Sequence, residues 1–255
     1  MYFRKLNTRG KITYIVTVIL LSLVVAGIGF AWWAAQAAEP MPEALAALLS
    51  DDQVTVDYTV WLTFTPTTQA PTNGFIFYPG GRVDPRAYAP AAHAIAAAGY
   101  LVVIVPMPLN LAVLAPNRAE EVIAAFPAIK QWAIGGHSLG GTMAASFAAD
   151  HPGAVNKLIL WAAYPASSSS LANRDDLLVT TIYGTNDGLA TVADIEAARP
   201  DLPPTTTYVP LEGGNHAQFG WYGPQTGDNT ASISRAVQQE ATIAATLQAL
   251  AADTP

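Results

Sequence analysis

A serine set among glycines is the residue of this sequence best suited to chemistry. Ser138 lies in the stretch GGHSLGG, residues 135–141, and forms a G-x-S-x-G pattern between the apolar run QWAI and an alanine-rich helical pattern. Glycines there let a strand turn sharply into a helix, which exposes the serine hydroxyl above the sheet. A plain glycine-rich helix start with Ser138 as its N-cap fits the same letters, so the rest of the chain must decide.

A serine hydroxyl is a weak nucleophile at neutral pH and needs a base, and the base needs a carboxylate that fixes its tautomer. Asp187 follows the apolar segment LLVTTIYG, and His216 follows TTTYVPLEGG. Taken alone, Asp187 also fits an Asn-Asp-Gly turn and His216 an ordinary loop. Because all three residues follow predicted strands in the order serine, acid, histidine, we predict Ser138 as nucleophile, His216 as base and Asp187 as orienting acid.

Other histidines and aspartates compete for these roles. His93 lies inside a predicted helix, His137 adjoins the serine with its side chain expected to point away from it, and His151 ends a helix before a proline. Asp194 and Asp201 lie on or after a helix. Since none of these residues follows a strand near the end of the chain, they are weaker candidates.

A tetrahedral intermediate needs two hydrogen-bond donors. The Leu139 N–H at the start of the predicted helix is one candidate. The stretch FYPGGRVDP follows an earlier strand, and there we favour the Gly81 N–H, with Arg82 as the alternative. The same stretch also fits a plain glycine turn.

The elements that must position these residues alternate along the chain. Strands are predicted at residues 54–64, 74–80, 100–107, 131–138, 157–165, 177–184 and 205–214, and helices at 87–100, 117–129 (with Asn117 as N-cap), 140–152, 192–200 and 230–252. This alternation predicts a mostly parallel central sheet with helices on both faces. The first strand or pair, before Gly74, is expected to run antiparallel at the edge.

The loops suggest an open site. About ten residues separate the strand that ends near Pro165 from the strand that begins near Leu177, which leaves no room for a lid domain. We therefore expect an open site that acts on short soluble substrates without interfacial activation. Apolar side chains near the same sheet edge are candidates for an acyl pocket or for plain packing: Met107, Leu109, Leu111, Phe219, Trp221 and Tyr222.

The N-terminus predicts export. No charged residue occurs from Ile12 to Ala38, and the run is long enough to cross a bilayer as a helix. Basic residues precede it and acidic residues follow it: Arg4, Lys5, Arg9 and Lys11, then Glu39 and Glu43. The positive-inside rule places the N-terminus in the cytoplasm and the catalytic domain outside. A long signal peptide cleaved near AAQA, residues 34–37, and secretion of the rest is the alternative.

These patterns divide the chain into residues 1–37 (basic flank and anchor), 38–53 (linker with a possible helical turn) and 54–255 (catalytic domain). Four of the 12 basic residues precede the apolar run, so residues 39–255 contain 19 acidic and 8 basic side chains, a formal charge of −11. That charge argues against a nucleic-acid partner. Four scattered histidines predict no metal site, and the sequence shows no phosphate loop or dinucleotide motif, so no cofactor is expected.

The stretches FYPGGRVDPRAYAP, VVIVPMPLNLAVL, IGGHSLGGTMAASFA, YGTNDGLA and LEGGNHAQFGWYG together resemble the α/β-hydrolase superfamily over about residues 54–250. They are most similar to a small bacterial serine hydrolase group akin to dienelactone hydrolases. The resemblance implies the α/β-hydrolase fold and gives Ser138, His216 and Asp187 the roles of nucleophile, base and orienting acid. It also implies a carboxylesterase-like enzyme that cleaves an ester or related acyl bond of a small substrate through an acyl-enzyme.

Two departures from the family pattern bear on this expectation. Many relatives place His-Gly before the oxyanion donor, where this chain has Pro79-Gly80-Gly81. Dienelactone hydrolases proper use a cysteine nucleophile, and this chain has no cysteine. The alternative function is a non-catalytic, membrane-anchored binding or scaffold protein on the same fold, because a fold does not fix a function.

Overall fold

The computed structural model describes residues 7–253, so Arg4 and Lys5 of the expected basic flank lie outside the described residues. The chain divides into two units, one up to Gln36 and a second from Ala37 onward. The first unit is the helix α1 (Thr8–Ala35), whose N-cap Asn7 accepts a hydrogen bond from the Gly10 N–H. Its mean hydropathy reaches 2.5, so by length and composition it is able to cross a membrane, a test that a signal sequence also meets.

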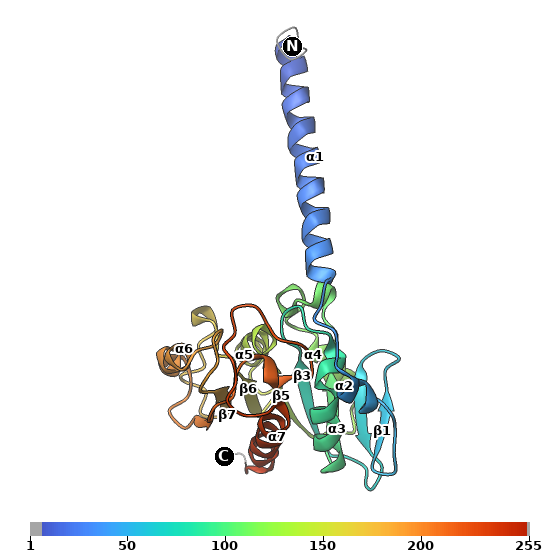
Figure 1. The fold of residues 1–255 in the computed structure, drawn as a ribbon, viewed down its shortest axis with the longest axis vertical. Helices are drawn as coiled ribbons and strands as arrows, with labels where there is room; N and C mark the ends of the chain where they lie inside the picture. Colours follow the sequence, from blue (N-terminus) through green and yellow to red (C-terminus); the bar gives the residue numbers. More distant parts are fainter. Residues whose placement is uncertain (1–6, 254–255) are drawn as a thin grey trace. The chain divides into compact units, whose positions relative to one another are not determined.

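The second unit is built on one eight-stranded sheet with the order β1-β2-β4-β3-β5-β6-β7-β8 (Figure 1). The strands are β1 (Val54–Asp57), β2 (Leu62–Pro66), β3 (Asn73–Tyr78), β4 (Leu101–Ile104), β5 (Gln131–His137), β6 (Lys157–Trp161), β7 (Leu178–Gly184) and β8 (Thr207–Leu211). Strands β3 to β8 pair in parallel, whereas β1 and β2 are antiparallel and β2 joins β4 antiparallel. The mostly parallel sheet with an antiparallel edge is therefore confirmed.

The segment at residues 54–64 forms a pair of strands, the alternative to a single edge strand, because it folds as part of a hairpin. Its first half is β1 and its end belongs to β2, with Val54 paired to Pro66 and Asp57 to Thr63. The Asp57 carboxylate accepts hydrogen bonds from the Thr59 N–H and hydroxyl, which turns the chain between the two strands. A continuous apolar alternation concealed this turn.

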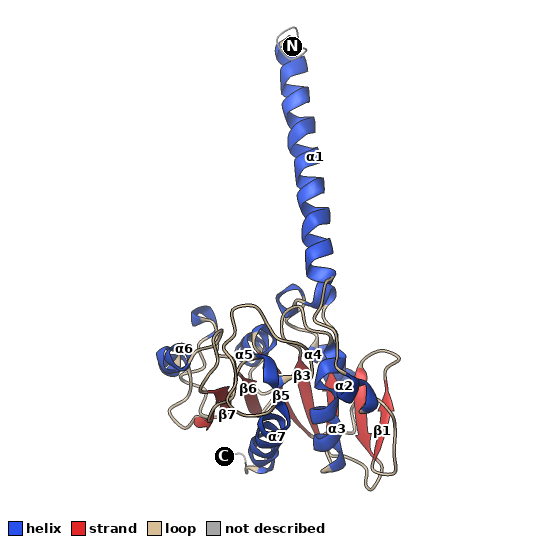
Figure 2. Ribbon diagram, in the orientation of Figure 1, coloured by secondary structure: helices blue, strands red, loops and turns tan. Residues whose placement is uncertain are grey.

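Helices cover both faces of the sheet (Figure 2). They are α2 (Pro42–Ala46), α3 (Ala89–Ala97), α4 (Ala119–Ala125), α5 (Leu139–Asp150), α6 (Val192–Ala197) and α7 (Arg235–Ala251). One core cluster joins α3 and α7 to Phe75 and Phe77, and the other joins α4 and α5 to Ile76. Consecutive residues of β3 thus point to opposite faces, as the pleat of a buried strand requires.

Two helix starts differ from the sequence-based boundaries. Helix α4 begins at Ala119 with Arg118 at the N-cap, so the cap predicted at Asn117 is wrong by one residue. Helix α7 begins at Arg235, because the Ser234 side chain accepts a hydrogen bond from the Val237 N–H and caps the helix there. The segment before it, expected to be helical from residue 230, is a loop.

Residues 38–53, expected as a linker, are packed within the second unit. The Ala38 N–H donates to Arg82 O at 2.7 Å, and Ala38 forms a parallel bridge with Val83. Pro40 bridges Tyr222 in antiparallel fashion. Between β6 and β7 the described chain contains only one short 3₁₀ helix, at Ser167–Ser169, which agrees with the expected lack of a lid domain.

Candidate active site

Ser138 occupies the tight turn between β5 and α5. Its backbone has φ 52° and ψ −126°, a conformation that side-chain-bearing residues rarely adopt and that stores strain. The backbone of the turn packs tightly against the chain after β3, since a Cβ on Gly140 would lie only 2.3 Å from Pro79 O. Ser138 holds the N-cap position of α5, but its side chain caps no helical N–H, so capping does not account for a serine there. A half-exposed, strained serine at a strand-to-helix turn is the geometry of a displayed nucleophile.

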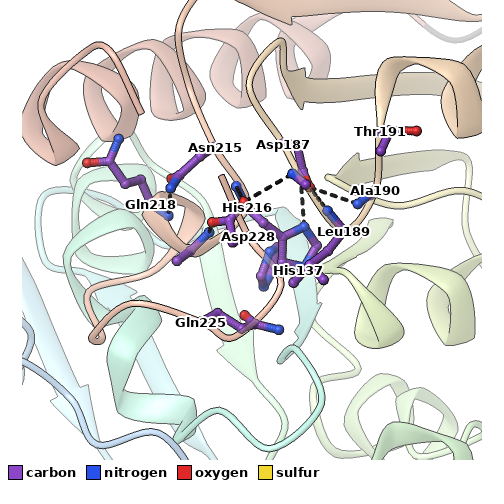
Figure 3. Close-up of polar contacts among 12 residues, drawn as sticks. His137, Asp187, Leu189, Ala190, Thr191, Asn215, His216, Gln218, Gln225 and Asp228 are labelled. Atoms are coloured by element: carbon purple, nitrogen blue, oxygen red, sulfur yellow. Dashed lines mark hydrogen bonds and ion pairs between the residues drawn. The ribbon is translucent and has the colours of Figure 1, made fainter. Parts of the chain in front are cut away.

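Asp187 and His216 are brought together from two separate loops at the carboxyl ends of β7 and β8. His216 Nδ1 lies 2.8 Å from Asp187 Oδ2, and both side chains are buried (Figure 3). The other carboxylate oxygen of Asp187 accepts the N–H groups of Leu189 and Ala190, each at 2.7 Å. Because a carboxylate can only accept, Nδ1 of His216 carries a proton in this pair and Nε2 is left to act as a base.

The link between His216 and Ser138 is not closed by a hydrogen bond. The buried Nε2 of His216 has no hydrogen-bond partner among residues 7–253. The His216 ring packs instead against His137, the residue before Ser138, with ring centroids 4.5 Å apart. The serine and the histidine therefore lie in the same neighbourhood, and catalytic hydrogen bonds are often long until substrate binds.

Gly81 and Leu139, the residues expected to carry the oxyanion donors, are neighbours in the structure. A Cβ built on Gly81 would contact the Leu139 side chain at 3.1 Å. The Leu139 N–H opens α5 and has no intrahelical acceptor, and within the described chain the Gly81 N–H has no acceptor either. The N–H of Arg82 donates to Asn110 O at 2.8 Å, so Arg82 is the poorer candidate.

Asp228 lies beside the Asp187–His216 pair, and the sequence reasoning did not single it out. Its Oδ1 accepts the N–H groups of Gly188 at 3.1 Å and His216 at 3.2 Å, and its Oδ2 accepts the Ala217 N–H at 2.8 Å (Figure 3). One carboxylate thereby ties the loop of Asp187 to the loop of His216. Its sequence context, GDN in a polar loop, gave no signal of this role.

The competing residues have other partners. His93 lies 3.4 Å from Asp51, and His151 lies 2.6 Å from Glu120. Asp194 completes a capping box at the start of α6. The remaining competitors are Asp201, which lies in the 3₁₀ helix Arg199–Asp201, and His137, which is fully buried with its ring against that of His216. Across the described residues no group of three or more histidine, cysteine or acidic side chains is placed to hold a metal ion.

The expected acyl-pocket residues separate into two groups. Phe219 and Tyr222 are fully buried around His137, so they belong to the core beneath the site. Leu111 lies next to Gly81, and Leu109 is 38% exposed on the same loop. Met107 is buried in the core cluster that includes α5, and Trp221 is half-buried.

Comparisons with known proteins identify the family and the fold. A family model described as "Alpha/beta hydrolase family" matches residues 74–240, whereas no curated protein matches the sequence. Among solved structures, Est1E from Butyrivibrio proteoclasticus with bound ferulic acid has 12% identity and a TM-score of 0.57, covering 80% of this chain and 98% of that one. A thermophilic esterase from Thermogutta terrifontis with bound propionate has 17% identity and a TM-score of 0.52, covering 76% and 92%. These identities support the shared fold only.

Proposed function

This chain belongs to the alpha/beta hydrolase family, and from that premise we propose that it is a serine hydrolase that cleaves an ester bond of a small substrate. The observation that supports the proposal most is the buried Asp187–His216 pair, at the sheet edge where Ser138 is displayed. Esterases among the structural neighbours agree with this chemistry at the level of fold.

In the proposed reaction Ser138 Oγ attacks the acyl carbon while His216 Nε2 accepts the serine proton. Asp187 stabilises the resulting imidazolium through Nδ1. The Leu139 and Gly81 N–H groups donate to the oxygen of the tetrahedral intermediate. The intermediate then releases the alcohol, which takes the proton from His216, and water hydrolyses the acyl-enzyme by the same steps.

We further propose that the enzyme acts outside the cytoplasmic membrane. The support is helix α1, with Arg9 and Lys11 at its beginning and Glu39 and Glu43 after its end. This charge arrangement favours a cytoplasmic N-terminus. The apolar run is longer than the core of a usual signal peptide, which favours an uncleaved single-pass anchor. N-terminal sequencing of the protein purified from membranes tests this, since a mature chain that begins near residue 38 would mean cleavage and secretion.

The test of the activity is the intact mass of the full chain in detergent after treatment with a fluorophosphonate, beside Ser138→Ala. A single adduct on the wild type that is absent from the variant is expected, because only an activated serine reacts readily with this reagent. A folded wild type that gains no adduct and hydrolyses no acyl substrate would refute the proposal. The binding-protein alternative would then stand.

A further inference from the structure

A buried tyrosine and histidine connect the oxyanion loop to the catalytic histidine. Tyr88 ends the 3₁₀ helix Pro85–Tyr88, and His137 ends β5. The Gly80 N–H donates to the Tyr88 hydroxyl at 3.0 Å, and the hydroxyl lies 2.9 Å from His137 Nδ1. His137 in turn packs against His216. Neither Tyr88 nor His137 has a role in the reaction as described so far.

The Gly80 hydrogen bond favours one tautomer of His137. Because the Tyr88 hydroxyl already accepts the Gly80 N–H, we assign its own proton to the contact with His137 Nδ1. With Nδ1 as the acceptor, the ring proton lies on Nε2, which is buried and has no hydrogen-bond partner among residues 7–253. Burial lowers the pKa of His137 well below its usual value, the neighbouring His216 lowers it further, and only the His216 backbone acts in the opposite direction. His137 is therefore neutral at physiological pH.

Packing leaves this arrangement no freedom. A Cβ on Gly80 would lie 2.7 Å from His137 Nδ1 and 2.9 Å from the Tyr88 hydroxyl, so only glycine fits against the pair. Phe219 stacks on His137 with ring centroids 5.7 Å apart, and Tyr222 lies at 6.4 Å. The loop of Gly80 and the ring of His216 thus contact the same rigid pair.

We propose that Tyr88 and His137 form a positioning pair, which aims the oxyanion loop through Gly80 and presents a neutral ring to His216. This inference rests on the proposed hydrolase function. A neutral His137 lets His216 take the proton of Ser138 without an adjacent like charge. The Gly80 hydrogen bond orients the next peptide, and with it the N–H of Gly81.

The test uses full-length variants in detergent and a short soluble ester. Tyr88→Phe removes both hydrogen bonds, and His137→Leu removes the acceptor with little change in size. His137→Asn places an amide oxygen near the Nδ1 position, where it can still accept from Tyr88. Tyr78→Phe is the matched control, because the buried Tyr78 hydroxyl also accepts an N–H, from Ala119, and donates to a carbonyl, that of Pro116.

We expect kcat to fall about tenfold or more in Tyr88→Phe and in His137→Leu, with KM changed less than about threefold. His137→Asn should retain kcat within about threefold, as should Tyr78→Phe. The double variant should fall no further than the more impaired single variant, because each single variant already breaks the Tyr88–His137 hydrogen bond. Full kcat in both single variants, or an equal loss in His137→Asn and His137→Leu, would overturn the proposal.

Histidine ¹⁵N NMR gives a readout that needs no turnover. The ring resonances of His137 are identified as those present in the wild type and missing from His137→Asn. They should show a proton on Nε2 alone at pH 7. In Tyr88→Phe the preference of His137 for the Nε2-protonated tautomer should be lost. A proton on Nδ1 in the wild type overturns the positioning pair even if the enzyme is active. If the wild type is not labelled by a fluorophosphonate, the hydrolase function fails, and the NMR result alone supports or overturns the Tyr88–His137 hydrogen bond.

Discussion

Asp187→Asn should inactivate the enzyme without unfolding it. Two backbone N–H groups donate to Asp187 Oδ1, so an asparagine must turn its carbonyl oxygen toward Leu189 and Ala190. The NH₂ group of the asparagine then takes the place of Asp187 Oδ2, the oxygen that lies 2.8 Å from His216 Nδ1. A donor at that position forces the proton of His216 onto Nε2, where it blocks the acceptance of the serine proton.

The magnitude follows from the lost charge. Two unit charges about 4 Å apart interact with about 4 kcal/mol at an effective dielectric constant of about 20. Losing that stabilisation of the imidazolium lowers kcat by about 10³-fold, at about 1.4 kcal/mol per factor of ten. The misplaced proton adds to this loss. Because every hydrogen bond of the site keeps a partner, the free energy of unfolding should change by less than about 1.5 kcal/mol.

The assay is kcat for a short ester together with the rate of fluorophosphonate labelling. Asp194→Asn is the matched control, since Asp194 is an acid of the same region that caps α6. The Thr191 side-chain cap is kept and asparagine retains an oxygen acceptor, so the variant should lose less than about 1 kcal/mol of stability and keep kcat unchanged. An Asp187→Asn enzyme that keeps kcat within tenfold of the wild type would show that Asp187 does not set the tautomer of His216.

Four further predictions concern Asp228, Ser138, His137 and the connection between β6 and β7. Asp228→Asn should lower the free energy of unfolding, measured in urea, by about 2 kcal/mol, because an NH₂ group would then face a backbone N–H. The control Asp175→Asn, at an exposed position, should have no effect. Equal stabilities of the two variants would contradict the bridging role of Asp228. Ser138→Gly should be more stable than Ser138→Ala by about 1 kcal/mol in the same assay, since φ 52° strains any residue with a Cβ. The depressed pKa of buried His137 means that below about pH 6.5 the unfolded chain binds a proton that the folded chain does not. Stability should therefore decrease toward acid more steeply in the wild type than in His137→Asn, by up to about 1.4 kcal/mol per pH unit, and parallel curves would count against a neutral His137. Finally, the rate on a short ester should not rise when the substrate concentration passes its solubility limit, since the described chain between β6 and β7 forms no lid; a jump at that point would argue for interfacial activation.

Sequence reasoning succeeded where the signal is local. The period of apolar residues located β3 to β8, and the glycines around Ser138 predicted a turn that only small neighbours allow. The placement of Asp187 and His216 after two strands also predicted that these two side chains meet at one sheet edge. It did so because parallel strands bring their carboxyl ends to the same side.

The sequence reasoning failed where contacts join distant segments. Nothing in the local pattern showed that Asp228 would accept N–H groups from two loops, or that Ala38 would pair with Val83. The hairpin within residues 54–66 was concealed because both of its strands share one apolar alternation. A boundary set by a side-chain cap, as at Ser234, also depends on a single hydrogen bond.

By itself the sequence determined the fold class, the apolar N-terminal helix and the three residues proposed for catalysis. Tertiary structure alone decided how those residues are held: the burial of Asp187 with His216, the placement of Gly81 beside Leu139, and the contact of His137 with Tyr88 and His216. The reason is physical. Backbone periodicity and glycine conformations act within a few residues, whereas a buried polar group takes whichever partner the converging loops bring within hydrogen-bond distance.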